Sequence, residues 1–153
     1  MNRKAFLISF LVIAALLALP MTVSAHQTVT VGDYDIEYGW VNEPAVVNQP
    51  NAVVINISQK GAQDANIDAS RVQIQAVYGG VSKTLTLQPL GENTPGQFIA
   101  PMTPTRPGVY TIHIGGKIGS TMLNNDVQPE EIQTADVVQF PPVDAQINIE
   151  PNQ

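Results

Sequence analysis

Two segments of alternating polarity flank a glycine pair in RVQIQAVYGGVSKTLTLQ, residues 71–88 of the chain. Apolar and polar side chains alternate along residues 71–78 and again along 81–88, which is typical of strands with one buried face. Gly79 and Gly80 accept the positive φ angles that a tight two-residue turn requires. The stretch therefore predicts an antiparallel hairpin.

Strand patterns continue on both sides of this hairpin. Gly32-Asp33 is the expected turn between the first two strands, and Gly115-Gly116 is the expected turn of a second hairpin. Residues 59–70 are polar and predict an irregular connection. The other predicted strands cover residues 28–31, 34–40, 52–58, 97–102, 109–114 and 117–123.

The number and spacing of these segments predict the fold class. No segment shows a sustained helical period, so any helix is expected to be a single turn within residues 62–69 or near residues 129–132. The pattern predicts an all-β, immunoglobulin-like β-sandwich of about seven or eight antiparallel strands. Tyr110 opens a late strand after a proline-rich turn, and we expect its hydroxyl to bond nearby backbone.

The amino-terminal residues have the organisation of a secretory signal. Arg3 and Lys4 precede an apolar run over residues 5–19, and Val23-Ser24-Ala25 supplies the small residues of a cleavage site. The run is shorter than the roughly 20 apolar residues of a membrane span, so a retained anchor is the less favoured alternative. We expect the mature chain to begin at His26, to be periplasmic or secreted, and to lack a membrane span.

The chain is therefore expected to have three parts. Residues 1–25 are the signal peptide, residues 26–140 form the sandwich domain, and residues 141–153 form a loose acidic tail with prolines. Within the domain, Val137, Val138 and Phe140 are predicted to form a final edge strand.

Composition excludes several classes of function. The chain has no cysteine, which rules out a disulfide framework, a thiolate metal site and a cysteine nucleophile. Its net charge is −6, and loss of Arg3 and Lys4 with the signal makes the mature chain more acidic. This charge disfavours nucleic acid and anionic lipid as partners. Phosphate-binding loops, nucleophile elbows and zinc-protease helices are absent from the sequence, so we expect no enzymatic activity.

His26 is the most informative residue of the mature chain. Cleavage after Ala25 would give it a free α-amine beside its imidazole, and these two nitrogens can chelate one metal ion. The α-amine has a pKa near 8, low enough for copper(II) to displace its proton. Imidazole nitrogen also suits copper(II), which leads the divalent affinity order. We therefore expect a copper(II) site at this residue.

His113 is the chain's other histidine and lies in a predicted strand. If Ile112 and Ile114 face the core, His113 faces outward, where it is either a second metal ligand or an exposed strand histidine. Carboxylates that could add an oxygen ligand are Asp33, Glu37, Glu43 and Asp126. Met102 and Met122 are too few for a methionine-rich copper(I) site, and we expect both in the core.

Two further features have structural interpretations. Residues 64–70 alternate oxygen-bearing side chains as a calcium loop does, but Ala69 and Gln75 occupy the positions of its glycine and glutamate. A polar connecting loop is therefore favoured. Trp40 could stack on a sugar ring, but core packing is the favoured interpretation.

The mature start and one internal stretch resemble known exported domains. Ala25-His26-Gln27-Thr28-Val29 resembles the start of YcnI-like domains, which bind copper through an N-terminal histidine. A signal followed by a small β-sandwich also resembles the CopC-type periplasmic copper-binding domains. The stretch from Gly96-Gln97-Phe98 to Pro107-Gly108-Val109-Tyr110-Thr111 is similar to YtkA-like and FixH-like immunoglobulin-type domains.

The resemblance implies a copper site around His26. The CopC pattern adds an Asp-x-His pair, but Thr111 stands where the aspartate before His113 would be. The YcnI pattern adds a glutamate and a tryptophan, for which Glu43 and Trp40 are the candidates. The candidate metal ligands are thus His26, His113 and Glu43.

The predicted function is copper(II) binding through His26, with His113 as second ligand, for copper sequestration or delivery. The alternative is a metal-free accessory or interaction domain of the immunoglobulin type that contacts a membrane or surface partner. A third alternative is a carbohydrate-binding module that uses Trp40 and the tyrosines.

Overall fold

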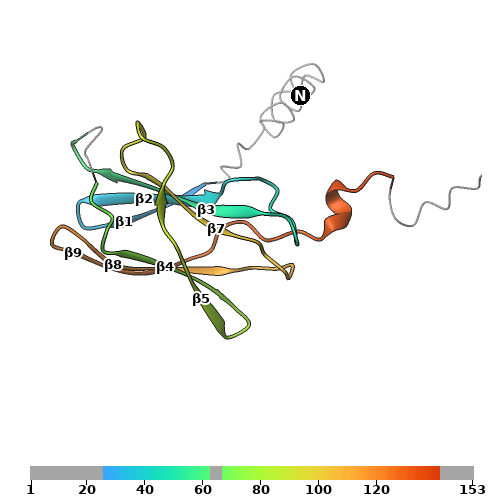
Figure 1. The fold of residues 1–153 in the computed structure, drawn as a ribbon. Coiled ribbons are helices and arrows are strands. Elements are labelled where there is room, and N and C mark those ends of the chain that lie inside the picture. Colours follow the sequence, from blue (N-terminus) through green and yellow to red (C-terminus); the bar gives the residue numbers. More distant parts are fainter. Residues whose placement is uncertain (1–25, 63–66, 142–153) are drawn as a thin grey trace, which may run out of the picture.

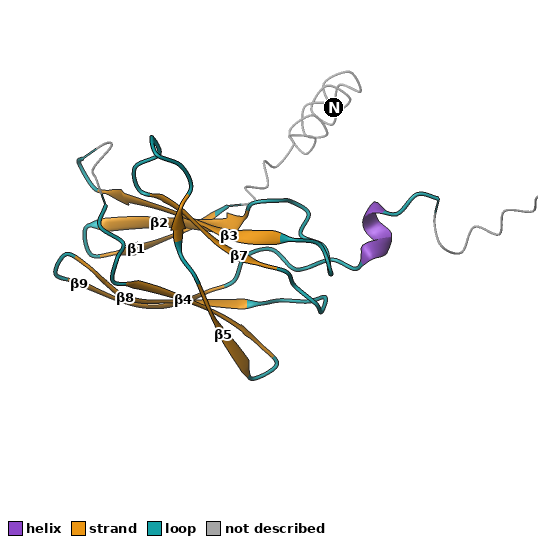
Figure 2. Ribbon diagram, viewed as in Figure 1, coloured by secondary structure: helices purple, strands orange, loops and turns teal. Residues whose placement is uncertain are grey.

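The computed structural model describes residues 26–62 and 67–141, which form two antiparallel sheets packed face to face (Figure 1). The strands are β1 (Gln27–Val31), β2 (Tyr34–Trp40), β3 (Asn51–Gln59), β4 (Val72–Tyr78), β5 (Val81–Leu85), β6 (Gln88–Pro89), β7 (Gln97–Met102), β8 (Thr111–Ile118) and β9 (Thr121–Val127). Figure 2 shows that the described part is strand and loop apart from one 3-10 turn, η1 (Ala135–Val138).

The strand order is that of an immunoglobulin domain. One sheet runs β1-β2-β3-β7-β6 and the other β5-β4-β8-β9. Strands β2-β3-β7-β6 follow the A-B-E-D order and β5-β4-β8-β9 the C′-C-F-G order, while β1 adds a strand beside β2. The predicted all-β, immunoglobulin-like sandwich is confirmed.

The core lies between the sheets and is built mainly from β-branched side chains. Alternate residues of β2 and β3, such as Ile36 and Ile55, face Ile74, Ile112 and Ile114 from β4 and β8, and all five are completely buried. A period-two strand places the residues between them on the outer face. Burial of the isoleucines therefore fixes which polar residues reach solvent.

Tyr110 is a structural tyrosine, as predicted. Its hydroxyl donates to the Arg106 carbonyl at 3.2 Å and accepts from the Arg106 N–H at 3.3 Å. Its ring stacks on Tyr78 with centroids 4.6 Å apart and meets Trp40 edge to face at 6.4 Å. These contacts hold the turn that leads into β8.

The hairpin of residues 71–88 is confirmed at its turn, but its second strand is shorter than predicted. Tyr78 pairs with Val81 across Gly79 and Gly80, whose φ angles are 57° and 80°. The alternating pattern continues past Leu85, yet the chain then leaves this sheet and adds β6 to the other one. Alternation marks an extended chain and does not specify which sheet pairs with it.

The predicted turn at Gly115-Gly116 is wrong. Strand β8 runs through both glycines, and the hairpin turns instead at Gly119 (φ 57°) and Ser120. Gly116 (φ 94°) is required because a Cβ there would collide with the Arg71 carbonyl at the start of β4. A glycine inside a strand often marks such a close backbone approach.

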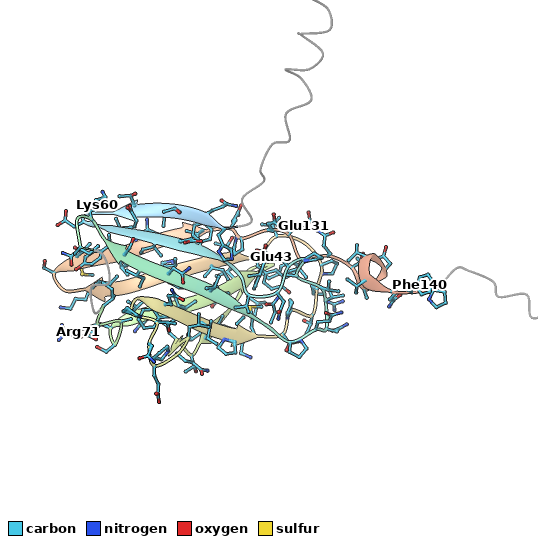
Figure 3. All side chains as sticks on the ribbon, turned by 90° about the horizontal axis from the view of Figure 1, so that it is seen from above. Glu43, Lys60, Arg71, Glu131 and Phe140 are labelled. Carbon is cyan, nitrogen blue, oxygen red and sulfur yellow. The ribbon has the colours of Figure 1, made fainter. Side chains whose placement is uncertain are left out.

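The predicted final edge strand is also wrong. Val137 and Val138 belong to η1, and Figure 3 shows the labelled Phe140 beyond it, away from the sheets. The single turn expected near residues 129–132 occurs just after them as η1, while Ile132 itself pairs with Gly108 in an isolated bridge. Its paired backbone groups leave Ile132 no helical partner.

Some expectations have a different outcome or fall outside the described residues. Met102 packs against the core as expected, whereas Met122 is exposed on the outer face of β9. The signal peptide at residues 1–25, most of the tail at 141–153 and residues 63–66 of the polar connection lie outside the described residues. Within the described residues, no helix has the length and apolar character to cross a membrane.

We predict that Tyr110→Phe lowers the free energy of unfolding by about 1–2 kcal/mol, because both hydrogen bonds to Arg106 are lost. Urea denaturation followed by tryptophan fluorescence measures the change. Tyr34→Phe is the control, since the Tyr34 hydroxyl makes no hydrogen bond to the described residues. Equal effects of the two substitutions would contradict a structural role for the Tyr110 hydroxyl.

Candidate functional site

His26 immediately precedes β1 and lies against the outer face of β2. The hairpin register pairs Gln27 with Tyr38, which places His26 beside Gly39. A Cβ on Gly39 would overlap the His26 ring, so the imidazole occupies space that only a glycine leaves open. The ring is therefore seated on the β2 backbone instead of projecting into solvent.

Both ring nitrogens of His26 face acceptors. Nδ1 lies 2.8 Å from Glu37 Oε1, and Nε2 lies 3.4 Å from the Trp40 carbonyl oxygen. A protonated imidazole satisfies both contacts because each of its nitrogens donates. If a metal ion replaces the proton on Nδ1, the Nε2–H group can still donate to the Trp40 carbonyl.

These contacts determine the protonation of His26. Partial burial is the largest single influence and lowers its pKa. The hydrogen bonds to Glu37 and to the Trp40 carbonyl, with the negative charges of Glu37 and Glu43, together outweigh that burial and raise the pKa above 6.5. Glu43 is thus near enough to act on His26 through its charge, although Glu37 makes the direct contact.

Trp40 supports the site from the core side and does not form a surface platform. Its side chain is only 1% exposed, and its Nε1–H donates to the Glu130 carbonyl at 2.7 Å. The expected core packing is therefore confirmed. The buried indole anchors the end of β2, and the backbone carbonyl of Trp40 faces His26.

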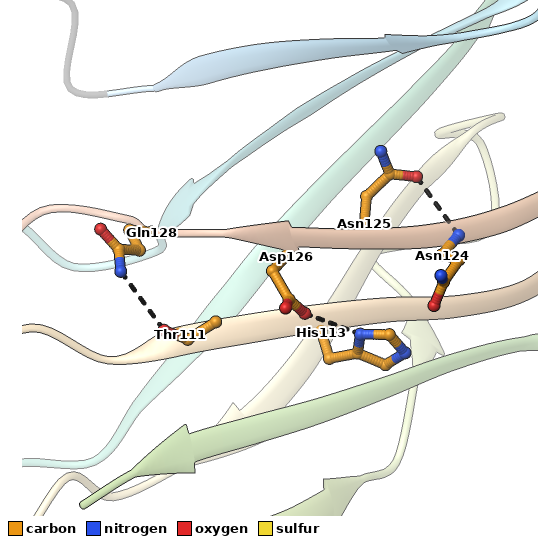
Figure 4. Close-up of polar contacts among 6 residues, drawn as sticks. All are labelled: Thr111, His113, Asn124, Asn125, Asp126 and Gln128. Carbon is orange, nitrogen blue, oxygen red and sulfur yellow. Dashed lines mark hydrogen bonds and ion pairs between the residues drawn. The ribbon is translucent and has the colours of Figure 1, made fainter.

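His113 forms a second histidine–carboxylate pair on the other sheet (Figure 4). Its Nδ1 lies 2.7 Å from Asp126 Oδ1, and the two residues are direct partners in the β8–β9 ladder. Ile112 and Ile114 point into the core, so His113 faces outward. A carboxylate thus reaches His113 from the neighbouring strand instead of from position 111.

The predicted site residues are therefore distributed over two sheets. His26 contacts Glu37 and lies within charge range of Glu43, whereas His113 contacts Asp126. Among residues 26–62 and 67–141, no cluster of three or more His, Asp or Glu side chains meets the geometric requirements of a metal site. Cleavage after Ala25 would create the α-amine of His26. This main-chain nitrogen would be a metal ligand in addition to the side chains.

Glu37 is the site residue that the sequence analysis did not single out, although it was among the carboxylates considered. A two-residue turn at Gly32-Asp33 pairs Val31 with Tyr34. The same register places Glu37 and Gly39 on the outer face beside His26. Extending the predicted hairpin backwards to His26 would therefore have identified both residues.

A polar groove adjoins Glu37 on the outer face of the five-stranded sheet. It is lined by Thr28, Glu37, Asn56 and Gln97, which form one row across four strands, and by the loop around Lys60. Asn56 Oδ1 at its floor is buried without a hydrogen-bond partner among the described residues. The Glu37 side chain is 42% exposed and is therefore accessible from solvent.

The calcium-loop pattern lies only partly within the described residues. Asp68 accepts a hydrogen bond from the Ser70 N–H at 3.0 Å, and hydrogen bonding from Ser70 lowers the pKa of Asp68. The carboxylate thus caps a local turn, which agrees with the interpretation of a polar connection.

No protein-family model matches the chain, and no curated protein matches it. Among solved structures, the chain is similar to a DUF4426 family protein from Pseudomonas aeruginosa PAO1. The two are 17% identical with a TM-score of 0.48, and the match covers 70% of this chain and 98% of that chain. Nothing about function follows from a similarity at this level, and the resemblance to copper-binding families stays a prediction from the residues.

We predict that Glu37→Gln lowers the pKa of His26, because the substitution removes the carboxylate charge and weakens its hydrogen bond. NMR titration of a chain with one alanine ahead of His26 measures this without an adjacent α-ammonium. The ring signals of His113 are the internal control.

The raised pKa of His26 determines how the contribution of the His26–Glu37 pair to folding stability changes with pH. The His26–Glu37 pair stabilises the fold fully below the ordinary histidine pKa, and this contribution is lost as the pH rises through the folded-state value. A titration midpoint of His26 that Glu37→Gln leaves unchanged would show that the pair does not form in solution.

Proposed function

We propose that this protein is an exported copper(II)-binding domain that sequesters or delivers the ion and is not an enzyme. After removal of residues 1–25, the His26 α-amine and imidazole Nδ1 would chelate the ion, with Glu37 as an oxygen donor. The mature chain would lie outside the cytoplasm. Because imidazole and amine nitrogens favour copper(II) over the other divalent ions, copper is the ion proposed.

The observation that carries the proposal is the position of Glu37 on the metal-binding side of the His26 ring. Nδ1 is the nitrogen that closes a six-membered chelate with the α-amine of the same residue. A carboxylate oxygen 2.8 Å from Nδ1 is near enough to share an ion with it. The carboxylate also offsets the positive charge that the ion brings.

The contact on the opposite nitrogen supports the same arrangement. A metal-binding histidine usually donates its other ring N–H to a carboxylate or a backbone carbonyl, which fixes its tautomer and orientation. Here the Trp40 carbonyl lies 3.4 Å from Nε2, and the buried Trp40 side chain holds that carbonyl in place. The ring is thus held with Nδ1 toward Glu37 before any ion binds.

His113 remains the second candidate ligand from the sequence. Asp126 at 2.7 Å holds its Nδ1, which leaves Nε2 as the nitrogen that could bind an ion. Because His26 and His113 belong to different sheets and contact different carboxylates, we propose His26 and Glu37 as the primary site. Glu43 would contribute through its charge.

We predict that the mature chain beginning at His26 binds one copper(II) ion tightly and that acetylation of the His26 α-amine abolishes this binding. The acetyl group removes the amine as a metal ligand and leaves the imidazole and Glu37 in place. The loss should exceed the ~10–100-fold that removal of a supporting partner costs. Calorimetric titration with copper(II), in competition with a chelator of known affinity, measures both constants.

Three single substitutions test the assignment of the other groups. Glu37→Gln should weaken copper(II) binding by about 10–100-fold, whereas the matched change Glu43→Gln should have a smaller effect because Glu43 acts only through its charge. His113→Ala should leave the affinity unchanged. A loss with His113→Ala would instead make His113 the second ligand, and equal binding by the mature chain with a free and with an acetylated α-amine would overturn the copper proposal.

A metal-free interaction domain is the second candidate function, and one observation favours it. The segment after the sandwich exposes three apolar side chains, Val137, Val138 and Phe140, of which Phe140 is 95% exposed (Figure 3). Exposed apolar residues of this kind can anchor a protein partner. Absence of copper binding together with a partner that Phe140→Ala releases would favour this function.

A further inference from the structure

In the part of the chain that the structure describes, strands β1 and β9 are the free edges of the two sheets on one side of the sandwich (Figure 1). The Gln27 side chain donates to the Gln128 carbonyl at 3.4 Å, so the start of β1 lies near the end of β9. A Cβ on Gly32, just after β1, would lie 3.2 Å from the Thr121 side chain at the start of β9. The two free edges therefore lie one above the other over their full length.

The opposite side of the sandwich carries features that prevent edge pairing. There the edge strands are β5, which is five residues long and contains Lys83, and β6, which has two residues and includes Pro89. Short strands, lysines and prolines are the usual means by which proteins protect sheet edges from other chains.

The β1 and β9 edges contain no lysine or proline. Strand β9 (TMLNNDV) is seven residues long, with no lysine or proline and Asp126 as its one charge. Strand β1 (QTVTV) has no charged residue. Among the described residues, β8 is the only strand that pairs with β9. A long, nearly uncharged edge is a template for a further strand.

We propose that this side of the sandwich pairs with a second copy of the same chain, β9 against β9 in antiparallel orientation. Full overlap of the seven residues places Asn124 opposite Asn124 of the second copy, and Met122 opposite Asp126. Each residue is then opposed by one whose side chain points to the same face of the sheet. The hydrophobic cores of both copies therefore lie on the same side of the extended sheet. The contact has the two-fold symmetry of an isologous dimer.

This register brings one pair of opposite charges from the two copies within reach of each other. Asp126 pairs with His113 in the β8–β9 ladder, and Met122 pairs with Lys117. Side by side across the four strands of the dimer therefore lie His113 and Asp126 of one copy, followed by Met122 and Lys117 of the second copy. The long Lys117 side chain can extend past Met122 toward Asp126, and no two like charges are opposed.

The same two-fold axis also brings the β1 strands together. Because β1 lies over β9, its central residue Val29 lies near the axis through Asn124. Val29 and Val31 face the core but are only partly buried in one copy. A neighbouring β1 strand covers them, so one contact protects both edges and removes apolar surface from water.

Single cysteines test the proposed register, because the native chain has none. Asn124→Cys should form a disulfide-linked dimer under mild oxidation, since directly opposed strand residues have the Cα separation that a disulfide needs. Met122→Cys, exposed on the same face of β9, should not, because its opposed residue is Asp126. Ser82→Cys on β5 is the control for random collision.

The oligomeric state gives the second readout. Sedimentation equilibrium of the mature chain in a metal chelator should show a monomer–dimer equilibrium. Asn124→Lys, which opposes two lysines, should weaken the dimer by about fivefold or more, while Ser82→Lys should not. A monomer at every soluble concentration, or equal cross-linking at positions 82, 122 and 124, would overturn the proposal. Since no copper is present, neither result depends on the copper site.

Discussion

The fold depends on burial of β-branched side chains between two sheets that no disulfide links. Ile36, Ile55, Ile74, Ile112 and Ile114 are completely buried, and the chain has no cysteine to replace their contribution. At roughly 25 cal/mol for each Å² of apolar surface removed from water, such side chains supply most of the stability of a domain of this size. Because side chains alternate along a strand, their burial also determines what the outer faces carry.

The two histidine–carboxylate pairs follow from this alternation of side chains along the strands. With Ile36 and Tyr38 in the core, Glu37 and Gly39 must lie on the outer face beside His26. With Ile112 and Ile114 in the core, His113 must face outward beside Asp126. Of the two pairs, only His26 would combine its ring with an α-amine in the mature chain. This is why the copper(II) proposal rests on the first pair.

Strand β1 has a role in both proposals, through different atoms. The imidazole of His26 lies against the outer face of β2, whereas the proposed pairing between copies uses the free backbone edges of β1 and β9. Metal binding and self-association can therefore be examined separately. The sandwich is asymmetric in this respect, because Lys83 and Pro89 protect only its other side.

Local sequence was sufficient for the approximate positions of most strands, the turn at Gly79-Gly80 and the role of Tyr110, because periodicity and turn chemistry act over a few residues. Glu37 could also have been found, since the Gly32-Asp33 turn fixes the register as far as His26. Only the tertiary structure decided that β8 continues through Gly115-Gly116, that β6 joins the other sheet, and that Asp126 reaches His113. These features depend on which distant strands pair and how closely their backbones approach. Alternation does not encode that choice, because any strand with the same buried face satisfies it.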